Sequence, residues 1–302
     1  MTIDRMTPKQ FRQAFRTEDQ CRAFLLARKH PDGFHCRKCG HSGHHEIAHR
    51  DAWQCAECGY QESAKAGTLF HKSHVSLTNW FQAILELTIA KGGISAVELR
   101  ERLGLGSYKT AWGMLHKLRK AMGLRDDSRP ELSGVVEIDG AVFGRRSRGN
   151  QDQAYMAVEV RMSAKGKPCA GRLAAARVVK FRRDEAVGFV SEQVAPSSTI
   201  RCDGGNDLTN LDLHVHVDLE TRKNEPYPIV ANNWLPWVNR VITNLKGALN
   251  GIYHGVSAKH LDKYLAEYCY RFNRRSARDR LQLCLIQACL ASRHISLADV
   301  SG

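Results

Sequence analysis

Apolar residues recur at helical spacing in the first half of the chain and predict three consecutive helices. The first apolar stripe runs from Leu77 to Thr88 and ends at a pair of glycines. Ser95 and Glu98 have the spacing of a capping box, which begins the second helix, and the third helix follows Ser107. We therefore expect a helical segment over residues 74–125.

The second and third of these helices are joined by a short turn that contains glycine. The third helix has one apolar face, and its basic residues are expected to lie off that face: Lys109, His116, Lys117, Arg119 and Lys120. Such a helix pair is typical of a helix-turn-helix that binds DNA. An ordinary helical hairpin with a solvated basic face has the same pattern, so this alternative stays open.

The periodicity changes after the polar stretch 125–130, which indicates a domain boundary. The segments with a strand pattern are 134–139, 155–162, 173–179 and 198–203, and a helix is predicted over 184–194. A right-handed crossover would bring the fourth strand beside the first as a parallel neighbour.

Asp139 ends the first of these predicted strands and Asp203 ends the fourth. The two carboxylates would then meet at the carboxyl ends of adjacent strands, where open α/β sheets place their sites. They would repel each other unless they shared divalent cations, and oxygen ligands suit Mg²⁺ or Mn²⁺. Such a site could clamp both oxygens of a phosphoryl transfer. Taken singly, each aspartate is better explained as a turn residue, so the prediction depends on the pair.

A further helix is predicted after Pro236, with apolar residues at helical spacing on one side. Asn239 and Lys246 lie within about 20° of each other around this helix, whereas Asn244 lies about 140° from Asn239. The amide of Asn239 could bind a metal or its water, and Lys246 could bind a DNA phosphate. An ordinary polar helix face is the alternative, and the choice between Asn239 and Asn244 as the third site residue stays open.

The composition favours a nucleic-acid partner. The chain has 45 Lys and Arg against 31 Asp and Glu, a net charge of +14 and a pI of about 9.5. This excess points to nucleic acid ahead of an anionic membrane. No apolar run reaches the roughly 18 residues that span a bilayer, and the start lacks a signal-peptide pattern. We expect a soluble, cytoplasmic protein with no membrane partner.

Four of the ten cysteines have the spacing of a structural zinc site. They form two Cys-x2-Cys pairs: Cys36 with Cys39 and Cys55 with Cys58. Gly40 and Gly59 follow the pairs, where a left-handed backbone is favourable only for glycine. Two coincidental pairs are the alternative, but the matched spacing predicts a zinc ribbon that holds Zn²⁺.

An arginine cluster follows several aromatic residues near the end of the chain: Arg271, Arg274, Arg275 and Arg278. Phosphate contact explains this cluster better than solvation alone, so we expect these residues to bind DNA. The aromatic residues themselves are more typical of a core.

These segments resemble bacterial insertion-sequence transposases of the DDE type, in which a zinc ribbon precedes a catalytic domain with a ribonuclease-H-like fold. Besides the cysteine pairs, the resemblance is carried by GTLFHKSHVSL (67–77), VEIDGAVFG (136–144), CDGG (202–205), LPWVNRVITNLK (235–246) and YHGVSAKHLDKYLAEYCYRFNRR (253–275). The resemblance implies that Asp139 and Asp203 are the first two catalytic acids and that Lys246 is the basic residue beyond the third. Many relatives have Glu at the third position, where this chain has Asn239.

The expected protein is a multi-domain α/β chain. Its parts are an N-terminal helical segment (1–29), a zinc ribbon (30–66), the helix-turn-helix segment (74–125) and a ribonuclease-H-like DDE domain with a mixed sheet (132–302).

The function implied is that of a transposase. It would bind the terminal repeats of its mobile element and use Mg²⁺ or Mn²⁺ to cleave DNA and transfer strands. Its partners would be double-stranded DNA, both element ends and target, and further copies of itself at the bacterial nucleoid. Two other functions stay open: a zinc-ribbon regulator with an inactive catalytic domain, and a ribonuclease-H-like nuclease without strand transfer.

Overall fold

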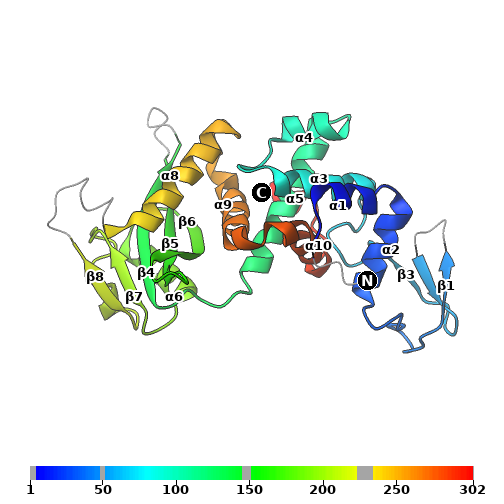
Figure 1. Ribbon diagram of the computed structural model, residues 1–302, viewed down its shortest axis with the longest axis horizontal. Coiled ribbons are helices and arrows are strands. Elements are labelled where there is room, and N and C mark those ends of the chain that lie inside the picture. Colours follow the sequence, from blue (N-terminus) through cyan, green and yellow to red (C-terminus); the bar gives the residue numbers. More distant parts are fainter. Residues whose placement is uncertain (1–4, 48–51, 145–150, 223–233, 302) are drawn as a thin grey trace. The chain divides into compact units, whose positions relative to one another are not determined.

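The computed structural model describes residues 5–47, 52–144, 151–222 and 234–301. The chain forms two compact units (Figure 1). The first consists of Met1–Leu124 with Ala277–Gly302, and the second of Arg125–Ser276. The last part of the chain thus packs with the first unit, whereas the sequence led us to expect it in the catalytic domain.

The first unit is mainly helical. Its elements are α1 (Pro8–Ala14), α2 (Glu18–Lys29), α3 (Leu77–Ile89), α4 (Ala96–Leu103), α5 (Tyr108–Asp126), α10 (Leu281–Ala291) and α11 (Ala298–Ser301), with a small antiparallel sheet of β1 (His44–Ile47), β2 (Ala52–Cys55) and β3 (Gln61–Ser63). Helix α10 packs on α3, and the backbone N–H of Leu69 donates to the carbonyl of Cys289 over 3.0 Å. This packing explains why the end of the chain belongs to this unit.

The three helices predicted from periodicity are present as α3, α4 and α5. The Ser95 hydroxyl accepts from the backbone N–H of Glu98 over 3.1 Å and so caps α4. Gly104 ends α4 with a φ of 61°, in the left-handed region.

The basic face predicted for α5 is largely covered. His116 and Arg119 are 0% and 1% exposed, and the Trp112 ring stacks on His116 at 3.9 Å. Lys109 does remain exposed. The prediction that His116 and Arg119 lie off the buried face was wrong, because α5 is buried around most of its circumference.

The second unit is built on a five-stranded mixed sheet in the order β6-β5-β4-β7-β8 (Figure 1). The strands are β4 (Val135–Phe143), β5 (Asp152–Met162), β6 (Pro168–Val178), β7 (Thr199–Cys202) and β8 (Asp218–Thr221), and the helical elements are α6 (Arg183–Gln193), η3 (Leu211–Leu213), α8 (Pro236–Gly251), α9 (Ala258–Asn273) and η4 (Arg275–Arg280), which runs into the first unit. Strands β4, β5 and β6 pair antiparallel, whereas β7 pairs parallel with both β4 and β8. The predicted β-β-β-α-β order and the parallel β4–β7 pair are confirmed.

Helices cover both faces of this sheet. Val136 and Ile138 of β4 belong to a core shared with α6, whereas Ala141 and Phe143 belong to a core shared with α8 and α9. Side chains of a strand alternate between faces, so the odd-numbered residues of β4 point toward α8 and α9.

Strand β4 continues beyond Asp139, which was predicted to be its last residue. Asp139 is paired with Met156, and the antiparallel β4–β5 ladder extends to Phe143. The parallel ladder with β7 has its last pair at Glu137 and Arg201. Asp139 therefore lies just beyond the parallel pairing while still inside the strand.

None of the helices in the described ranges has both the length and the apolar character needed to cross a membrane.

Candidate functional site

The four predicted zinc ligands converge in the first unit. The sulfur atoms of Cys36, Cys39, Cys55 and Cys58 all lie within 4.8 Å of one another. The distance is 3.5 Å between Cys36 and Cys58 and also 3.5 Å between Cys39 and Cys55. A tetrahedral zinc ion with Zn–S bonds of about 2.3 Å holds its sulfurs about 3.8 Å apart, so the cluster fits a structural Zn²⁺. Within the described part of the chain, this is the one cluster of at least three potential ligands that is tight enough for a metal.

The two cysteine knuckles have the same backbone geometry. The N–H of Gly40 donates to the carbonyl of Cys36 over 2.8 Å, and the N–H of Gly59 donates to the carbonyl of Cys55 over 3.1 Å. The glycines have φ values of 78° and 68°. Both are in the left-handed region, as predicted, where a side chain would introduce strain.

Asp139 and Asp203 are brought together by the β4–β7 register. Asp139 lies two residues beyond Glu137 within β4, and Asp203 lies two residues beyond Arg201, directly after the end of β7, so the shared register brings them to the same level. Cys202 is buried in the core on the α6 side, and alternation therefore turns Asp203 toward the face that Asp139 also shares.

The electrostatics of Asp139 reflect this proximity. The pKa of its carboxyl is raised to about 7, mainly by burial and then by the negative charge of Asp203, with a smaller contribution from Asp207. The Gly140 N–H, 2.7 Å from Oδ1, and the Lys246 ammonium act in the opposite direction and lower the pKa. Such a carboxylate cluster is costly without a cation and is the oxygen-rich donor set that Mg²⁺ or Mn²⁺ prefers. The chemistry of these oxygen donors therefore suits a divalent metal, although the three carboxylates are not gathered within 4.8 Å of one another as the four cysteine sulfurs are.

Asp207 is a residue of this site that sequence reasoning missed. The Tyr155 hydroxyl donates to its Oδ2 over 2.5 Å. A Cβ atom at Gly205 would lie 3.0 Å from Oδ1 of Asp207 and 3.4 Å from Oδ1 of Asp203, so both carboxylates lie against the same stretch of backbone. The only signal in the sequence is a second Asp four positions after Asp203.

Helix α8 is anchored to the sheet beside these aspartates. Oε2 of Glu137 accepts from the backbone N–H groups of Trp237 and Val238 over 2.8 and 2.9 Å. Glu137 is 2% exposed; burial raises its pKa, and the two N–H groups lower it. The indole N–H of Trp234 also donates to the carbonyl of Cys202 over 3.0 Å, directly before Asp203. The start of α8 is therefore fixed on both β4 and β7.

The two asparagines of α8 that are candidates for the third site residue differ in their exposure. Asn239 and Lys246 are half-buried, whereas Asn244 is exposed. Lys246 is near enough to Asp139 to lower its pKa, and Asn239 lies two helical turns away on the same face. These observations favour Asn239 over Asn244.

Three of the four arginines predicted to bind DNA make contacts within the second unit. Arg274 is 9% exposed, pairs with Asp126 over 2.8 Å and lies 3.4 Å from the ring centroid of Tyr270. Arg275 donates to two carbonyls of β6, and Arg271 pairs with a glutamate of its own helix. The fourth, Arg278, is exposed, and the arginines of residues 145–148 lie outside the described residues. These contacts favour a structural role for the three arginines.

A mixed sheet of this order, with helices on both faces and aspartates at β4 and β7, is consistent with a ribonuclease-H-like α/β domain. Two family profiles match the chain and together cover more than half of it. The transposase zinc-ribbon domain matches residues 16–61, and the ISXO2-like transposase domain matches residues 131–273. The chain belongs to the insertion-sequence transposases.

One relative is the uncharacterized protein in transposable element ISH50 of Halobacterium salinarum, which is 27% identical over 132 residues. The match covers 42% of this chain and 42% of that protein, so the chain matches less than half the length of this relative. Among solved structures, a chain of the simian T-cell lymphotropic virus intasome in complex with PP2A regulatory subunit B56 gamma aligns at 13% identity with a TM-score of 0.30, over 62% of this chain and 64% of that one. A similarity at that level supports no conclusion.

We expect the purified protein to contain about one zinc ion per chain, bound by the four cysteines. Cys55→Ser should lose the zinc and unfold the ribbon while leaving the second unit folded, because the four thiolates lie in the first unit. Elemental analysis and circular dichroism would measure both effects. Cys284→Ser, which changes a cysteine outside the cluster, is the control and should keep its zinc; zinc-free wild-type protein would contradict the assignment.

Glu137→Ala should lower the free energy of unfolding of the second unit by about 2 kcal/mol, because two buried N–H groups would lose their acceptor. Glu137→Gln keeps one acceptor oxygen and should cost less. Urea denaturation would measure both variants. An equal loss in the two would show that the carboxylate oxygens do not hold the helix.

Proposed function

We propose that this transposase binds the terminal repeats of its mobile element, cleaves one strand at each end, and uses the freed 3′-hydroxyl to attack target DNA. The observation that carries the proposal is the level placement of Asp139 in β4 and of Asp203 directly after β7, the parallel neighbour of β4. An acidic cluster in this position is suited to phosphodiester chemistry, since it can concentrate cations where a phosphate must be approached.

The roles of the individual residues follow from their positions. Asp139 and Asp203 hold the metal, and Asp207, which is fixed by Tyr155, adds charge to the cluster. A bound Mg²⁺ or Mn²⁺ would supply Lewis-acid chemistry at the attacking and leaving oxygens. Lys246 holds a phosphate oxygen beside the cluster, and the neutral amide of Asn239 completes the site from α8.

The first unit would recognise the DNA ends through the zinc ribbon and helices α4 and α5. Element ends come in pairs, so the active assembly requires at least two copies of the chain. DNA cleavage and strand transfer would take place in the bacterial cytoplasm, at the nucleoid.

Asp139→Asn and Asp203→Asn should each reduce strand cleavage by at least about 100-fold, equivalent to about 2.7 kcal/mol of transition-state stabilisation. Binding of the ends should change little, because each change keeps the shape of the side chain. Nicking of a labelled end duplex in Mg²⁺ would measure this effect. The exposed Asp212 offers a matched control as Asp212→Asn, which should cleave normally.

Joining of the same labelled ends to a plasmid separates a transposase from a nuclease. Cleavage without joined product would support the nuclease alternative. Wild-type cleavage by either variant would exclude that aspartate from the site.

Asn239→Ala should reduce cleavage sharply, and raised Mn²⁺ should restore part of it, because Mn²⁺ binds nitrogen and oxygen ligands more tightly than Mg²⁺ does. Asn244→Ala is the matched change on the exposed side of the same helix and should leave cleavage near the wild-type level. Cleavage rates over a Mn²⁺ titration would compare the two variants. A larger loss in Asn244→Ala would reverse the assignment.

A further inference from the structure

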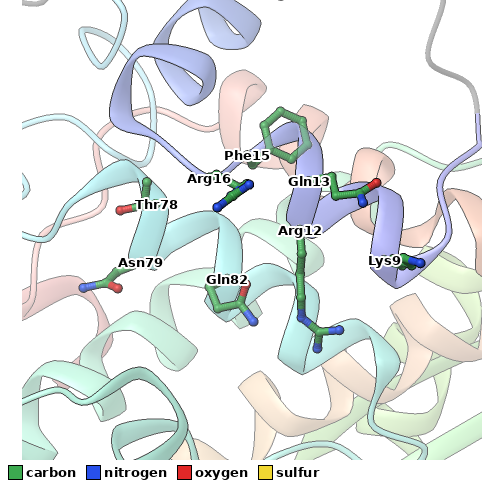
Figure 2. A pocket seen from close by; sticks show the side chains of 8 residues that line it. All are labelled: Lys9, Arg12, Gln13, Phe15, Arg16, Thr78, Asn79 and Gln82. Carbon is green, nitrogen blue, oxygen red and sulfur yellow. The ribbon is translucent and has the colours of Figure 1, made fainter.

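An open pocket with a volume of about 570 Å³ lies between helices α1 and α3 of the first unit (Figure 2). Lys9 and Arg12 come from α1, and Arg16 comes from the segment that follows it. The opposite wall, on α3, is made by Thr78, Asn79 and Gln82. None of the described residues that line the pocket is acidic.

The cations of the pocket differ in how they are held. Arg12 donates to Oε1 of Glu86 over 3.2 Å, and the Gln82 amide donates to the same oxygen over 2.9 Å. Glu86 is 4% exposed, and its other oxygen pairs with Arg102 of α4 over 2.5 Å. The buried Glu86 carboxylate thus orients Arg12 and Gln82. Its negative charge is balanced by Arg12 and Arg102.

Lys9 and Arg16 are both exposed. Within the described ranges, neither side chain pairs with an acid. Their charges are therefore available to a ligand, and the pocket is positive overall.

Aromatic packing and a helix cap hold the walls of the pocket in place. The Phe15 ring lies 4.6 Å from both Phe11 and Phe81, so aromatic packing joins the two helices. Glu18 accepts from the backbone N–H groups of Leu77 and Thr78 over 2.9 and 2.7 Å and so caps α3. Because these N–H groups are occupied, the ligand would be bound by side chains.

We propose that this pocket binds the sugar–phosphate backbone of duplex DNA, as a positioning contact that does not read sequence. The inference rests on the proposed function, since it assigns residues to the DNA binding of the first unit. The lining combines Lys, Arg, Asn and Gln, which are side chains that contact phosphate and sugar in protein–DNA complexes, whereas the Thr78 hydroxyl already donates to Glu18 over 2.8 Å. An acidic protein segment would also match the charge, but its affinity would depend more on apolar anchors than this mainly polar lining provides.

Several basic residues that the sequence suggested as DNA contacts are committed to other interactions. Two of the basic residues of α5 are buried, and three of the four C-terminal arginines make contacts inside the second unit. Lys9 and Arg16 have no such contacts within the described residues.

The test compares the zinc-loaded full chain with the double variant Lys9→Ala/Arg16→Ala. Arg12 is left in place, because its removal would take a partner from the buried Glu86. Fluorescence anisotropy would measure affinity for a random-sequence duplex and for an element-end duplex over a range of salt concentrations. The variant should lose affinity for both duplexes by the same factor, and the slope of log affinity against log salt should fall by about 1.8, since each phosphate contact contributes about 0.9.

Lys165→Ala/Lys167→Ala is the matched control, because it removes two exposed charges from the β5–β6 turn, and it should keep the wild-type slope. An unchanged slope in the Lys9/Arg16 variant, with intact zinc content and circular dichroism, would overturn the proposal. So would a loss of affinity for polyglutamate without a loss for DNA, which would assign the pocket to an acidic protein segment. If the wild-type protein bound no DNA at all, the proposed function would fail as well, so the two failures are distinguishable.

Discussion

The candidate active site depends on the parallel pairing of β4 with β7. Their register places Glu137 opposite Arg201 and thereby brings Asp139 level with Asp203. Because side chains alternate along a strand, a slip of one residue would turn one aspartate to the opposite face of the sheet. Glu137, the last β4 residue in this parallel ladder, also accepts from the first turn of α8. Sheet register and helix position are therefore specified together.

Glutamates from neighbouring elements fix helix starts in both units by the same physical means. Glu137 accepts two backbone N–H groups at the start of α8, and Glu18 accepts two at the start of α3. Each carboxylate satisfies donors that the helix leaves unpaired and meets the positive end of its dipole. In both cases the acceptor comes from a different element, so the cap also determines where the helix lies. Glu137 thereby positions α8, which lines the candidate active site, and Glu18 positions α3, which lines the basic pocket.

Local patterns in the sequence were sufficient for the strand order, the cysteine knuckles and the cap at Ser95. These depend on periodicity, on chain chirality and on residues close together along the chain. The contributions of Asp207 and Glu137 depend on contacts with Tyr155 and with residues 237–238, which periodicity does not encode. The burial of Arg119 has a similar cause: the sequence gives one apolar stripe, but tertiary packing covers most of the circumference of α5. The choice of Asn239 as the third site residue stays a prediction from helix geometry, which uses only the face that Asn239 shares with Lys246.

The return of the last residues to the first unit has a consequence for synthesis on the ribosome. All of Arg125–Ser276 emerges before Leu281–Ala291, which packs on α3 and pairs with Leu69. The sheet unit can thus be complete while the helical unit still lacks one of its core helices. During that interval, the surface of α3 that α10 later covers is exposed, and such transient apolar surface favours association with other chains. The helical unit that emerges first from the ribosome is the last to finish folding.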